Sequence, residues 1–415
     1  KSIMRYLLIL MGVVAAIWAE QFSYEGYRVF RLHISNENQL RALASFNKDE
    51  IFDFWSSLRF DGKPTDVMVK PETQQILGWF LTATGIRYEI LIDNVEDAVQ
   101  KERIIQQRAS LMPEGISFTK YNRHDEINAY LNQMVREHPD IASLESAGKS
   151  YEGRDLKVLK ISTDPSANKP VIFVDAGIHA REWLAPAQAC YIINQLVEVA
   201  ENRKLLDKVD WYVLPVVNPD GYEYSHTHER FWRKSRSVGR ICNGTDGNRN
   251  FGFHWGGAGA SKEECSGNYM GPSPFSEPET QAVRDFILKY KNNIKLYLTF
   301  HSYGQFLLYP WGFTAELPEN SEELQQLGEQ VALAIRQVQG TTYIVGSSTN
   351  VLYLAAGGSD DWAKGVAGVE LVYTIELPGG SEGFDPPPED IMKYLPETWE
   401  GCKVYNQYIE EKFGK

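Results

Sequence analysis

The order of apolar and polar residues divides the chain into two parts. In residues 23–108, short stretches alternate apolar with charged positions, as at Phe30, Leu32 and Ile34. Such alternation is typical of strands that bury one face. In the rest of the chain, unbroken apolar stretches such as 171–175 lie between amphipathic helices, which indicates a sheet covered on both faces. The pattern therefore predicts a large α/β domain preceded by a small α+β unit.

The same patterns set the expected elements. In the small unit they predict strands at 28–34, 66–69 and 88–92 and helices at 36–55, 72–83 and 96–108. In the large domain they predict strands at 156–162, 171–175, 211–217, 296–300 and 369–375 and helices at 125–138, 181–200, 275–290, 321–338 and 396–413. Ser276, with Glu279 three residues later, predicts a capping box at the start of the 275–290 helix.

Residues 1–19 differ from the rest of the chain. Lys1 and Arg5 precede the apolar stretch 6–17, and small residues follow it. A basic start, an apolar stretch and a small residue at its end are typical of a secretory signal. As a helix this stretch would rise about 18 Å, which is short of a hydrocarbon core of roughly 30 Å. We therefore expect a signal peptide, a secreted extracellular protein and no stable membrane anchor.

A polar, charged segment separates the two units. It ends at Arg108, which Ala109 follows, and Pro and Gly residues come next. A basic residue before a small one at an exposed domain boundary suits cleavage by a trypsin-like protease, although an ordinary surface helix is the alternative. We expect cleavage after Arg108, with Arg103 as the next candidate. The expected divisions are a signal peptide at 1–19, a small unit at 20–108 and a large domain at 109–415.

Composition narrows the function classes. The 415 residues are 43% hydrophobic and 23% charged, which is ordinary for a globular protein and excludes a disordered or collagen-like chain. Lys and Arg number 42 against 55 Asp and Glu, so the net charge is −13. A nucleic-acid binder normally carries a basic surplus, and we expect no nucleic acid as a partner. Aromatic residues reach 12%, which suits a cleft for a peptide or a sugar.

Two predicted strands end beside residues that can bind a metal. His179 and Glu182 follow strand 171–175, and His301 follows strand 296–300. In open α/β sheets, functional sites lie beyond the carboxyl ends of the strands, so these side chains can meet. Two imidazoles and one carboxylate leave a fourth position for water, which is the arrangement of a catalytic zinc. A surface pair is the alternative reading of His179 and Glu182 alone.

A water activated by zinc also needs a base that is not a ligand. Glu376 ends an apolar strand and is the candidate, although such a carboxylate can also face solvent. Asp246 could accept the second N–H of a metal-bound histidine. The arginines of 229–236 form either an anion site or a basic surface turn. His226 and His228 are expected to be exposed turn residues and not ligands.

The chain has four cysteines. Cys242 and Cys265 flank a loop rich in Gly and Asn and are the expected disulfide, which would stabilise the fold by roughly 3 kcal/mol in the chain-entropy account. Cys190 and Cys402 lie in helix-like stretches and form either a second bridge or two buried thiols.

Several segments occur together and in order: 150–154, 179–183, 218–222, 231–234, 246–251, 301–303, 357–362 and 374–377. With these motifs the chain resembles the secreted zinc metallocarboxypeptidases, specifically the digestive procarboxypeptidases A and B of animals. The resemblance implies the zinc carboxypeptidase fold, with a mixed central sheet and helices on both faces, and one Zn²⁺ per chain. It also implies that residues 20–108 are an activation propeptide that covers the active site until a trypsin-like protease removes it.

The resemblance also implies a role for each matching residue. It makes His179, Glu182 and His301 the zinc ligands, Glu376 the general base, and Arg233 the group that polarises the scissile carbonyl and holds the oxyanion. Asn248, Arg249 and Tyr353 would grip the terminal carboxylate of the substrate, and Arg181, Tyr303 and Phe384 would form outer subsites. Because an internal peptide bond would leave a buried Arg249 unpaired, the enzyme is expected to be an exopeptidase.

Asp360 is the residue on which the expected specificity depends. The resemblance places it at the base of the pocket for the last side chain, where A-type enzymes carry an apolar residue and B-type enzymes carry Asp. A buried carboxylate without a cation costs several kcal/mol, so a Lys or Arg side chain would be selected. Gly312 and Ser348 are small and would leave room for it. The alternative is a carboxylate satisfied by neighbours, with A-type specificity for apolar or aromatic ends.

The expected protein is therefore the zymogen of a carboxypeptidase B-like enzyme in the digestive lumen. Its expected partners are peptides that end in Lys or Arg, an activating trypsin-like protease and proteinaceous carboxypeptidase inhibitors, and the expected state is a monomer. An inactive relative that binds peptide tails and a non-digestive regulatory carboxypeptidase are the alternatives. No predicted ligand or base is missing from the sequence, which disfavours the inactive relative.

Overall fold

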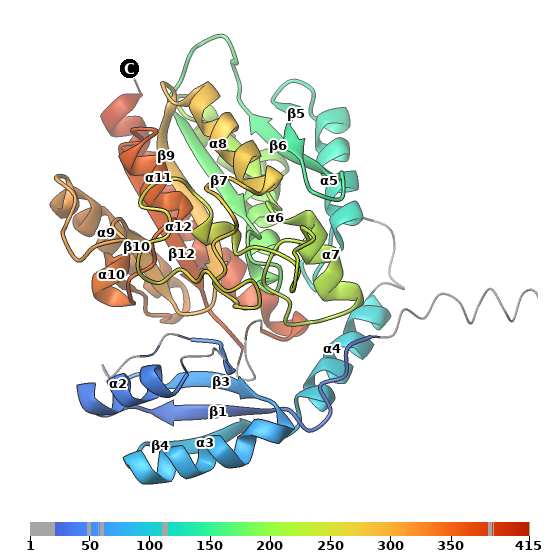
Figure 1. Ribbon diagram of the computed structural model, residues 1–415. Helices are drawn as coiled ribbons and strands as arrows, with labels where there is room; N and C mark the ends of the chain where they lie inside the picture. Colours follow the sequence, from blue (N-terminus) through green and yellow to red (C-terminus); the bar gives the residue numbers. More distant parts are fainter. Residues whose placement is uncertain are drawn as a thin grey trace, which may run out of the picture.

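The computed structural model describes residues 21–47, 51–56, 58, 62–109, 115–380, 384 and 386–414. Figure 1 shows a small N-terminal unit lying beneath a larger one, with helix α4 (Val95–Ala109) running between them. The predicted signal peptide at 1–19 lies outside the described residues.

The small unit is an antiparallel sheet with the strand order β2–β3–β1–β4. Its strands are β1 (Arg28–His33), β2 (Asp53–Phe54), β3 (Thr65–Val69) and β4 (Arg87–Ile92), and its helices are α2 (Glu37–Phe46) and α3 (Pro71–Thr84). Leu43 of α2 and Leu77 of α3 pack with Leu32 of β1 in a core of their own. Because side chains alternate along a strand, Val29 and Met68 lie on the opposite face, away from these helices.

The large unit is built on a mixed sheet of eight strands in the order β11–β10–β12–β9–β7–β8–β6–β5. The four central strands, β12, β9, β7 and β8, all run parallel to one another. The pairs β10–β12, β6–β8 and β5–β6 on either side of them are antiparallel. The strands are β5 (Ala142–Lys149), β6 (Asp155–Ile161), β7 (Val171–Ala176), β8 (Asp210–Leu214), β9 (Ile294–Ser302), β10 (Phe306–Tyr309), β11 (Ile344–Ser347) and β12 (Leu371–Leu377).

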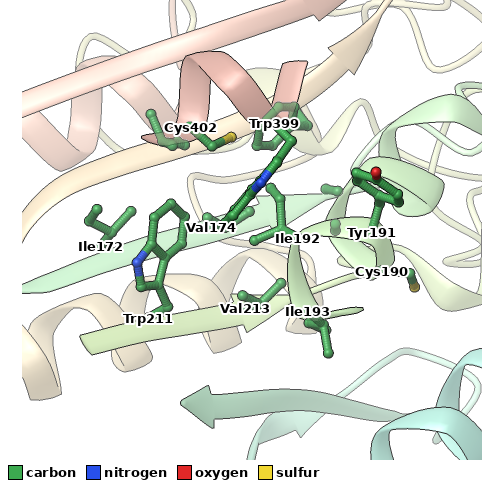
Figure 2. Packing of buried hydrophobic residues seen from close by; sticks show 14 of the residues in the cluster. Ile172, Val174, Cys190, Tyr191, Ile192, Ile193, Trp211, Val213, Trp399 and Cys402 are labelled. Carbon is green, nitrogen blue, oxygen red and sulfur yellow. The ribbon is translucent and has the colours of Figure 1, made fainter. Parts of the chain in front are cut away.

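Helices cover both faces of this sheet. On one face, Ile172 and Val174 of β7 share a core with Ile192 and Trp399, as Figure 2 shows. This face carries α5 (His124–Glu137), α6 (Leu184–Val197), α9 (Ser321–Gln339) and α12 (Ile391–Phe413). The other face carries α8 (Pro278–Tyr290) and α11 (Ser359–Gly365), against the alternate residue Phe173. Helices α7 (Pro219–Thr227) and α10 (Ser348–Val351) and the 3-10 turns Ala200–Leu206, Gly247–Arg249 and Pro388–Asp390 complete the described elements. The predicted fold class is confirmed.

Several predicted elements differ from the structure. The 36–55 helix is too long, because α2 ends at Phe46 and Asp53–Phe54 pairs with β3 as a strand. Strands β5, β10 and β11 and helices α7, α10 and α11 were not predicted, since their short or polar sequences give weak periodicity.

The predicted capping box at Ser276 is wrong. Helix α8 begins at Pro278, and its N-cap is Glu277, which makes no capping hydrogen bond through its side chain. The Ser276 hydroxyl donates instead to Glu277, 2.9 Å away, and accepts from Asn250. Glu279 is already committed to the Tyr151 backbone N–H at 2.9 Å.

The prediction that His226 and His228 are exposed is also wrong. Both lie at the end of α7 and are partly covered, not exposed. His226 stacks on Trp183 with 3.8 Å between ring centroids, and burial holds its pKa well below the usual value.

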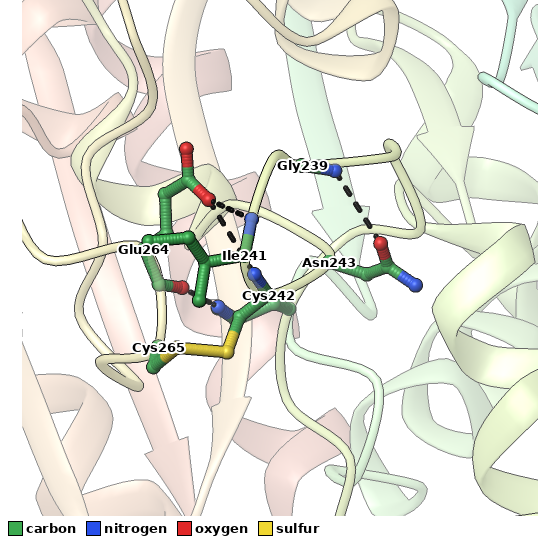
Figure 3. Close-up of a disulfide and its surroundings, with 7 residues drawn as sticks. Gly239, Ile241, Cys242, Asn243, Glu264 and Cys265 are labelled. Atoms are coloured by element: carbon green, nitrogen blue, oxygen red, sulfur yellow. Dashed lines mark hydrogen bonds between the residues drawn. A yellow bond between two sulfur atoms is a disulfide. The ribbon is translucent and has the colours of Figure 1, made fainter.

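The structure joins Cys242 to Cys265 in a disulfide, drawn in Figure 3. The Glu264 carboxylate accepts the backbone N–H of Ile241 at 2.7 Å and fixes the same loop. Cys190 and Cys402 are buried free thiols, and burial raises the pKa of Cys190 to about 12.

Candidate active site

The predicted site residues meet beyond the carboxyl ends of three neighbouring parallel strands. His179 follows β7, His301 lies near the end of β9, and Glu376 lies near the end of β12. The register of β9 and β12 places Glu376 directly beside His301. A cavity of about 1020 Å³ opens here. It is lined by His179, Arg181, Glu182, Arg233, Asn248, Arg249, His301, Tyr303, Tyr353, Asp360, Glu376 and Phe384, so the structure brings these predicted residues together.

The two histidines and Glu182 form a compact buried cluster. Nδ1 of His179 lies 2.8 Å from Glu182 Oε1, and Nδ1 of His301 lies 3.1 Å from Glu182 Oε2. The two Nδ1 atoms are 3.1 Å apart. Two imidazole nitrogens and a carboxylate that converge in this way form the donor set that a zinc ion takes, with room for a water as the fourth ligand. The residues therefore fit a divalent cation.

Asp246 connects this cluster to Arg233. Its Oδ1 lies 3.0 Å from Nε2 of His179, and its Oδ2 accepts from the Arg233 guanidinium at 2.9 Å. Burial alone would raise the pKa of Asp246, but the charges of Arg233 and His179 outweigh it and hold the pKa well below its usual range. Asp246 thus stays ionised and orients one histidine and one arginine at once.

Glu376 faces the same cavity without joining the cluster. Burial raises the pKa of Glu376 to about 7, while His301 lowers it and Glu182 raises it. A carboxylate whose pKa lies near neutrality can take up and return a proton at neutral pH, which is what general acid–base chemistry requires.

Arg249 is a buried cation with its hydrogen bonds directed to backbone oxygens. Its Nε donates to the Gly259 carbonyl at 2.9 Å and its Nη1 to the Asn248 carbonyl at 2.8 Å. Among the described residues no salt bridge to Arg249 occurs. Gly357 has a positive φ and approaches so closely that a Cβ there would lie 2.5 Å from the Arg249 carbonyl. The guanidinium is therefore held in place and can receive an anion from the cavity.

Asp360 lines the cavity, and its hydrogen-bond partners are the small polar residues Ser348 and Thr374. Its Oδ2 accepts from the Thr374 hydroxyl at 3.1 Å and from the Ser348 hydroxyl at 3.4 Å. The adjacent Asp361 does not line the cavity, because its carboxylate accepts the backbone N–H groups of Gly312 and Phe313. Thr374 had no predicted role, although its position two residues before Glu376 on one strand face could have indicated it.

The small unit covers the outer part of the cavity through polar contacts. Asp53 pairs with Arg181 at 2.8 Å, and Asp66, itself held by Arg31, accepts from the Tyr303 hydroxyl at 3.0 Å. These acidic residues were missed by sequence reasoning, because their partners lie more than a hundred residues away and no local pattern marks them.

Aromatic residues continue this cover. Trp55 packs on Phe231 and Phe384, with ring centroids 4.7 and 5.2 Å apart. Tyr24, which belongs to the same hydrophobic cluster as Trp55, also packs on Phe231, with 5.2 Å between ring centroids. Helix α4 adds an ion pair from Glu102 to Arg230. The residues predicted as outer subsites are thus occupied by the small unit.

A second group of potential ligands, Glu137, His138 and Glu198, lies at the surface. The Arg203 guanidinium lies 3.3 Å from Nδ1 of His138, and a cation beside that nitrogen opposes metal binding there. The buried cluster is the better metal site.

An α/β sheet that carries a buried His–Glu–His cluster and a nearby carboxylate at its carboxyl end is typical of a metal-dependent hydrolase. Comparison with known families agrees with this class. The family model described as zinc carboxypeptidase matches residues 127–401, and the family model described as carboxypeptidase activation peptide matches residues 30–102. The chain belongs to the zinc carboxypeptidases and carries their activation peptide, so the predicted resemblance, enzyme class and zinc cofactor are confirmed.

Individual relatives cover between 72% and 99% of this chain. Carboxypeptidase B of Astacus astacus is 49% identical over 303 residues, which is 72% of this chain and 100% of the relative. Carboxypeptidase B of Helicoverpa zea is 39% identical over 432 residues, covering 99% of this chain and 100% of the relative. The crystal structure of carboxypeptidase A from Helicoverpa armigera superposes with a TM-score of 0.88 at 35% identity, covering 94% of this chain and 98% of that one.

Arg108, the predicted cleavage site, is exposed in the last turn of α4. None of the helices within the described ranges has the length and apolar character needed to cross a bilayer.

Proposed function

We propose that the chain is the secreted zymogen of a carboxypeptidase that removes C-terminal Lys or Arg, and that a trypsin-like protease activates it by cutting after Arg108. The observation that carries the specificity is Asp360, a carboxylate 6% exposed that lines the cavity. The relatives from Astacus astacus and Helicoverpa zea, both named carboxypeptidase B, support it. The apolar stretch 6–17 supports secretion.

His179, Glu182 and His301 would hold the zinc ion, which when bound lowers the pKa of a water and polarises a carbonyl. Glu376 would take the proton from that water and later pass it to the leaving amine. Arg233 would stabilise negative charge that develops on the carbonyl oxygen. Its Nε and Nη2 are held by Asp246, while Nη1, 3.6 Å from Glu182, remains on the side of the cluster.

Asn248, Arg249 and Tyr353 would bind the terminal carboxylate. Ser359 N–H donates to the Asn248 side-chain oxygen at 2.9 Å, and this leaves the Asn248 amide nitrogen as a donor for the substrate. Arg249 is buried and would be left without an anion by an internal peptide bond, which costs free energy. These groups therefore favour cutting at the chain end.

Asp360 would select the last side chain of the substrate. A lysine or arginine entering the cavity brings the cation that this buried carboxylate lacks, whereas an apolar side chain would leave it uncompensated. Asn248 and Asp360 lie on either side of Gly358, where a Cβ would be 3.6 Å from the Asn248 side-chain oxygen and 2.5 Å from Asp360 Oδ1, so the proposed carboxylate site and Asp360 are close together.

Removal of the small unit would open the site. Arg181 is paired with Asp53, Tyr303 with Asp66, and Phe384 with Trp55. A peptide therefore cannot reach the proposed outer subsites while these contacts persist. Arg108 is exposed at the end of the connecting helix, which makes its bond accessible to a protease. We propose domain limits of 20–108 for the propeptide and 109–415 for a monomeric enzyme.

The test compares the purified precursor before and after trypsin, on blocked peptides that differ only in a final Lys, Arg or Phe. Trypsin is inhibited before the assay, and the new N-terminus is sequenced. We expect hydrolysis of the Lys and Arg peptides only after cleavage and a new N-terminus at Ala109. A preference for the Phe peptide would overturn the specificity, and equal activity before trypsin would overturn the activation.

A further inference from the structure

We infer that the pocket is built for a lysine ammonium group and that the enzyme prefers C-terminal Lys to C-terminal Arg. This inference rests on the proposed Lys/Arg specificity and adds a choice between the two cations. It is carried by the way in which Asp360 is hydrogen-bonded.

The two oxygens of Asp360 are not equivalent. Oδ2 accepts from Thr374 at 3.1 Å and from Ser348 at 3.4 Å. Oδ1 lies against Gly358, where a Cβ would come within 2.5 Å of it, and no hydrogen bond reaches Oδ1 from the described part of the chain. One carboxylate oxygen is therefore engaged by hydroxyl groups, and the other is left for the substrate.

A guanidinium and an ammonium need different partners. Arginine presents a planar fork that pairs with both oxygens of a carboxylate through two parallel hydrogen bonds. Because Oδ2 accepts the Thr374 hydroxyl at 3.1 Å and has the Ser348 hydroxyl 3.4 Å away, this side-on approach is hindered. Lysine ends in a compact ammonium with three donors that can point in three directions.

The pocket supplies three acceptors for these three donors. They are Oδ1 of Asp360 and the hydroxyl oxygens of Ser348 and Thr374, all on buried residues. A hydroxyl oxygen has lone pairs that accept while its hydrogen points elsewhere. For Ser348 that second direction exists, because its hydroxyl also lies 3.3 Å from the Tyr309 carbonyl. An ammonium that loses its hydration shell here would therefore regain hydrogen bonds.

The neighbouring carboxylate cannot complete an arginine fork. Asp361 Oδ1 accepts from the Gly312 N–H at 2.8 Å, and Oδ2 accepts from the Phe313 N–H at 2.9 Å. These bonds turn the Asp361 carboxylate away from the cavity and fix the backbone of the wall at Gly312. Gly312 also packs closely on Ala355, since a Cβ on Gly312 would be 3.0 Å from the Ala355 carbonyl. The Asp361 carboxylate is therefore not available to a guanidinium as a second acceptor.

The experiment uses the full-length precursor, activated by trypsin that is then inhibited, and measures kcat/KM on the peptides ending in Lys, Arg and Phe. We expect the Lys peptide to exceed the Arg peptide by about tenfold, which is the scale on which one misfitted group in a pocket discriminates. A kcat/KM for Arg equal to or above that for Lys, with both above Phe, overturns this inference and leaves the proposed function standing. A preference for Phe overturns the proposed function itself.

Two variants test the hydroxyl groups directly. Ser348→Gly and Thr374→Val each remove one acceptor, and each is expected to lower the Lys-to-Arg ratio several-fold by reducing kcat/KM for Lys. Thr374→Ser keeps the hydroxyl and loses only the methyl group, so it should show the wild-type Lys-to-Arg ratio. If packing of the methyl group were what mattered, Thr374→Ser would lower the ratio as well. Thr163→Val removes an exposed hydroxyl that bonds the Leu206 carbonyl and serves as the matched control. An unchanged ratio in both pocket variants overturns the assignment.

Discussion

The two units bury their sheets in different ways. In the large unit, helices cover both faces of the sheet, so its two cores are formed within the unit. In the small unit, α2 and α3 cover one face, while the residues of the other face, such as Val29, Trp55 and Met68, pack in a cluster that includes Phe384 of the large unit. The large unit can therefore keep its structure when the small one leaves, whereas the small unit loses part of its burial.

Their charged residues follow the same division. In the large unit, the charged residues of the site have partners within the same unit: Asp246 contacts both His179 and Arg233. The acidic residues of the small unit, Asp53 and Glu102, are paired with arginines across the interface. The comparison indicates that the His–Glu–His cluster and its partners Asp246 and Arg233 are assembled while the small unit is in place, and that the small unit supplies none of these residues.

The largest effect is expected from Glu376→Gln, which tests whether the chemistry belongs to the large unit alone. Loss of a general base should lower kcat of the trypsin-treated protein by about 10³-fold or more. The zinc content and the melting temperature should stay at wild-type values, since Glu376 lies outside the His–Glu–His cluster. Substantial activity in this variant would show that another group acts as the base.

The next effect concerns Asp360→Ile. Removing the buried carboxylate should lower kcat/KM for Lys and Arg peptides by about 10²- to 10³-fold, because the substrate cation is left without its partner. The same change should raise activity on peptides that end in Phe or Leu. Kinetics on the full peptide series measure this, and an unchanged preference for Lys and Arg would contradict the assignment of Asp360.

A smaller effect is expected at the interface between the units. Trp55→Ala removes a ring that packs on Phe231 and Phe384, and it should give the uncut precursor activity about tenfold above the wild-type background, because loss of a buried aromatic contact weakens an interface by about this factor. Trp79→Ala is the matched control, because Trp79 is 66% exposed on α3. An equal rise in both variants would mean that general loosening, and not this contact, controls the block.

The smallest effect concerns the stability of the large unit and its pH dependence. Burial raises the pKa of Glu279 to about 7 from a model-peptide value near 4.5. Below the unfolded pKa both states hold the proton and nothing is lost. Between about pH 4.5 and 7 the unfolded state loses its proton while the folded state keeps it, so stability falls across this range and levels off once the folded carboxyl has also ionised.

Glu279→Gln removes this ionisation and should stabilise the protein at pH 8 by about 1 to 3 kcal/mol, with little change at pH 4.5. Urea unfolding at the two pH values measures it. Because Glu279 belongs to the large unit, the gain should be equal before and after trypsin. A gain confined to the precursor would contradict the independence of the large unit.

The sequence predicted the parts of the fold that have strong local patterns. The apolar strand 171–175 and the helix 321–338 lie within a residue of β7 and α9. The short strands β10 and β11 were missed, because four residues carry too little periodicity to be read. The 36–55 helix was overextended because nothing local marks its end at Phe46.

The candidate site was predicted where chemistry and strand ends coincide. His179, His301 and Glu376 each follow or end an apolar strand, and this placed them together before the fold was known. Asp53, Trp55 and Asp66 could not be found in this way, since their role lies in fitting another unit. Ser348 was noted only for its small size, because its hydrogen bond to Asp360 depends on the packing of α10 against α11.

The most direct test measures zinc per chain in the uncut precursor and again after trypsin, together with hydrolysis of the Lys peptide. The account predicts about one zinc per chain in both forms, with activity only in the cut form, because the site is complete beneath the propeptide. A precursor without zinc, or one whose metal binding survives replacement of both His179 and His301 by Ala, would contradict it.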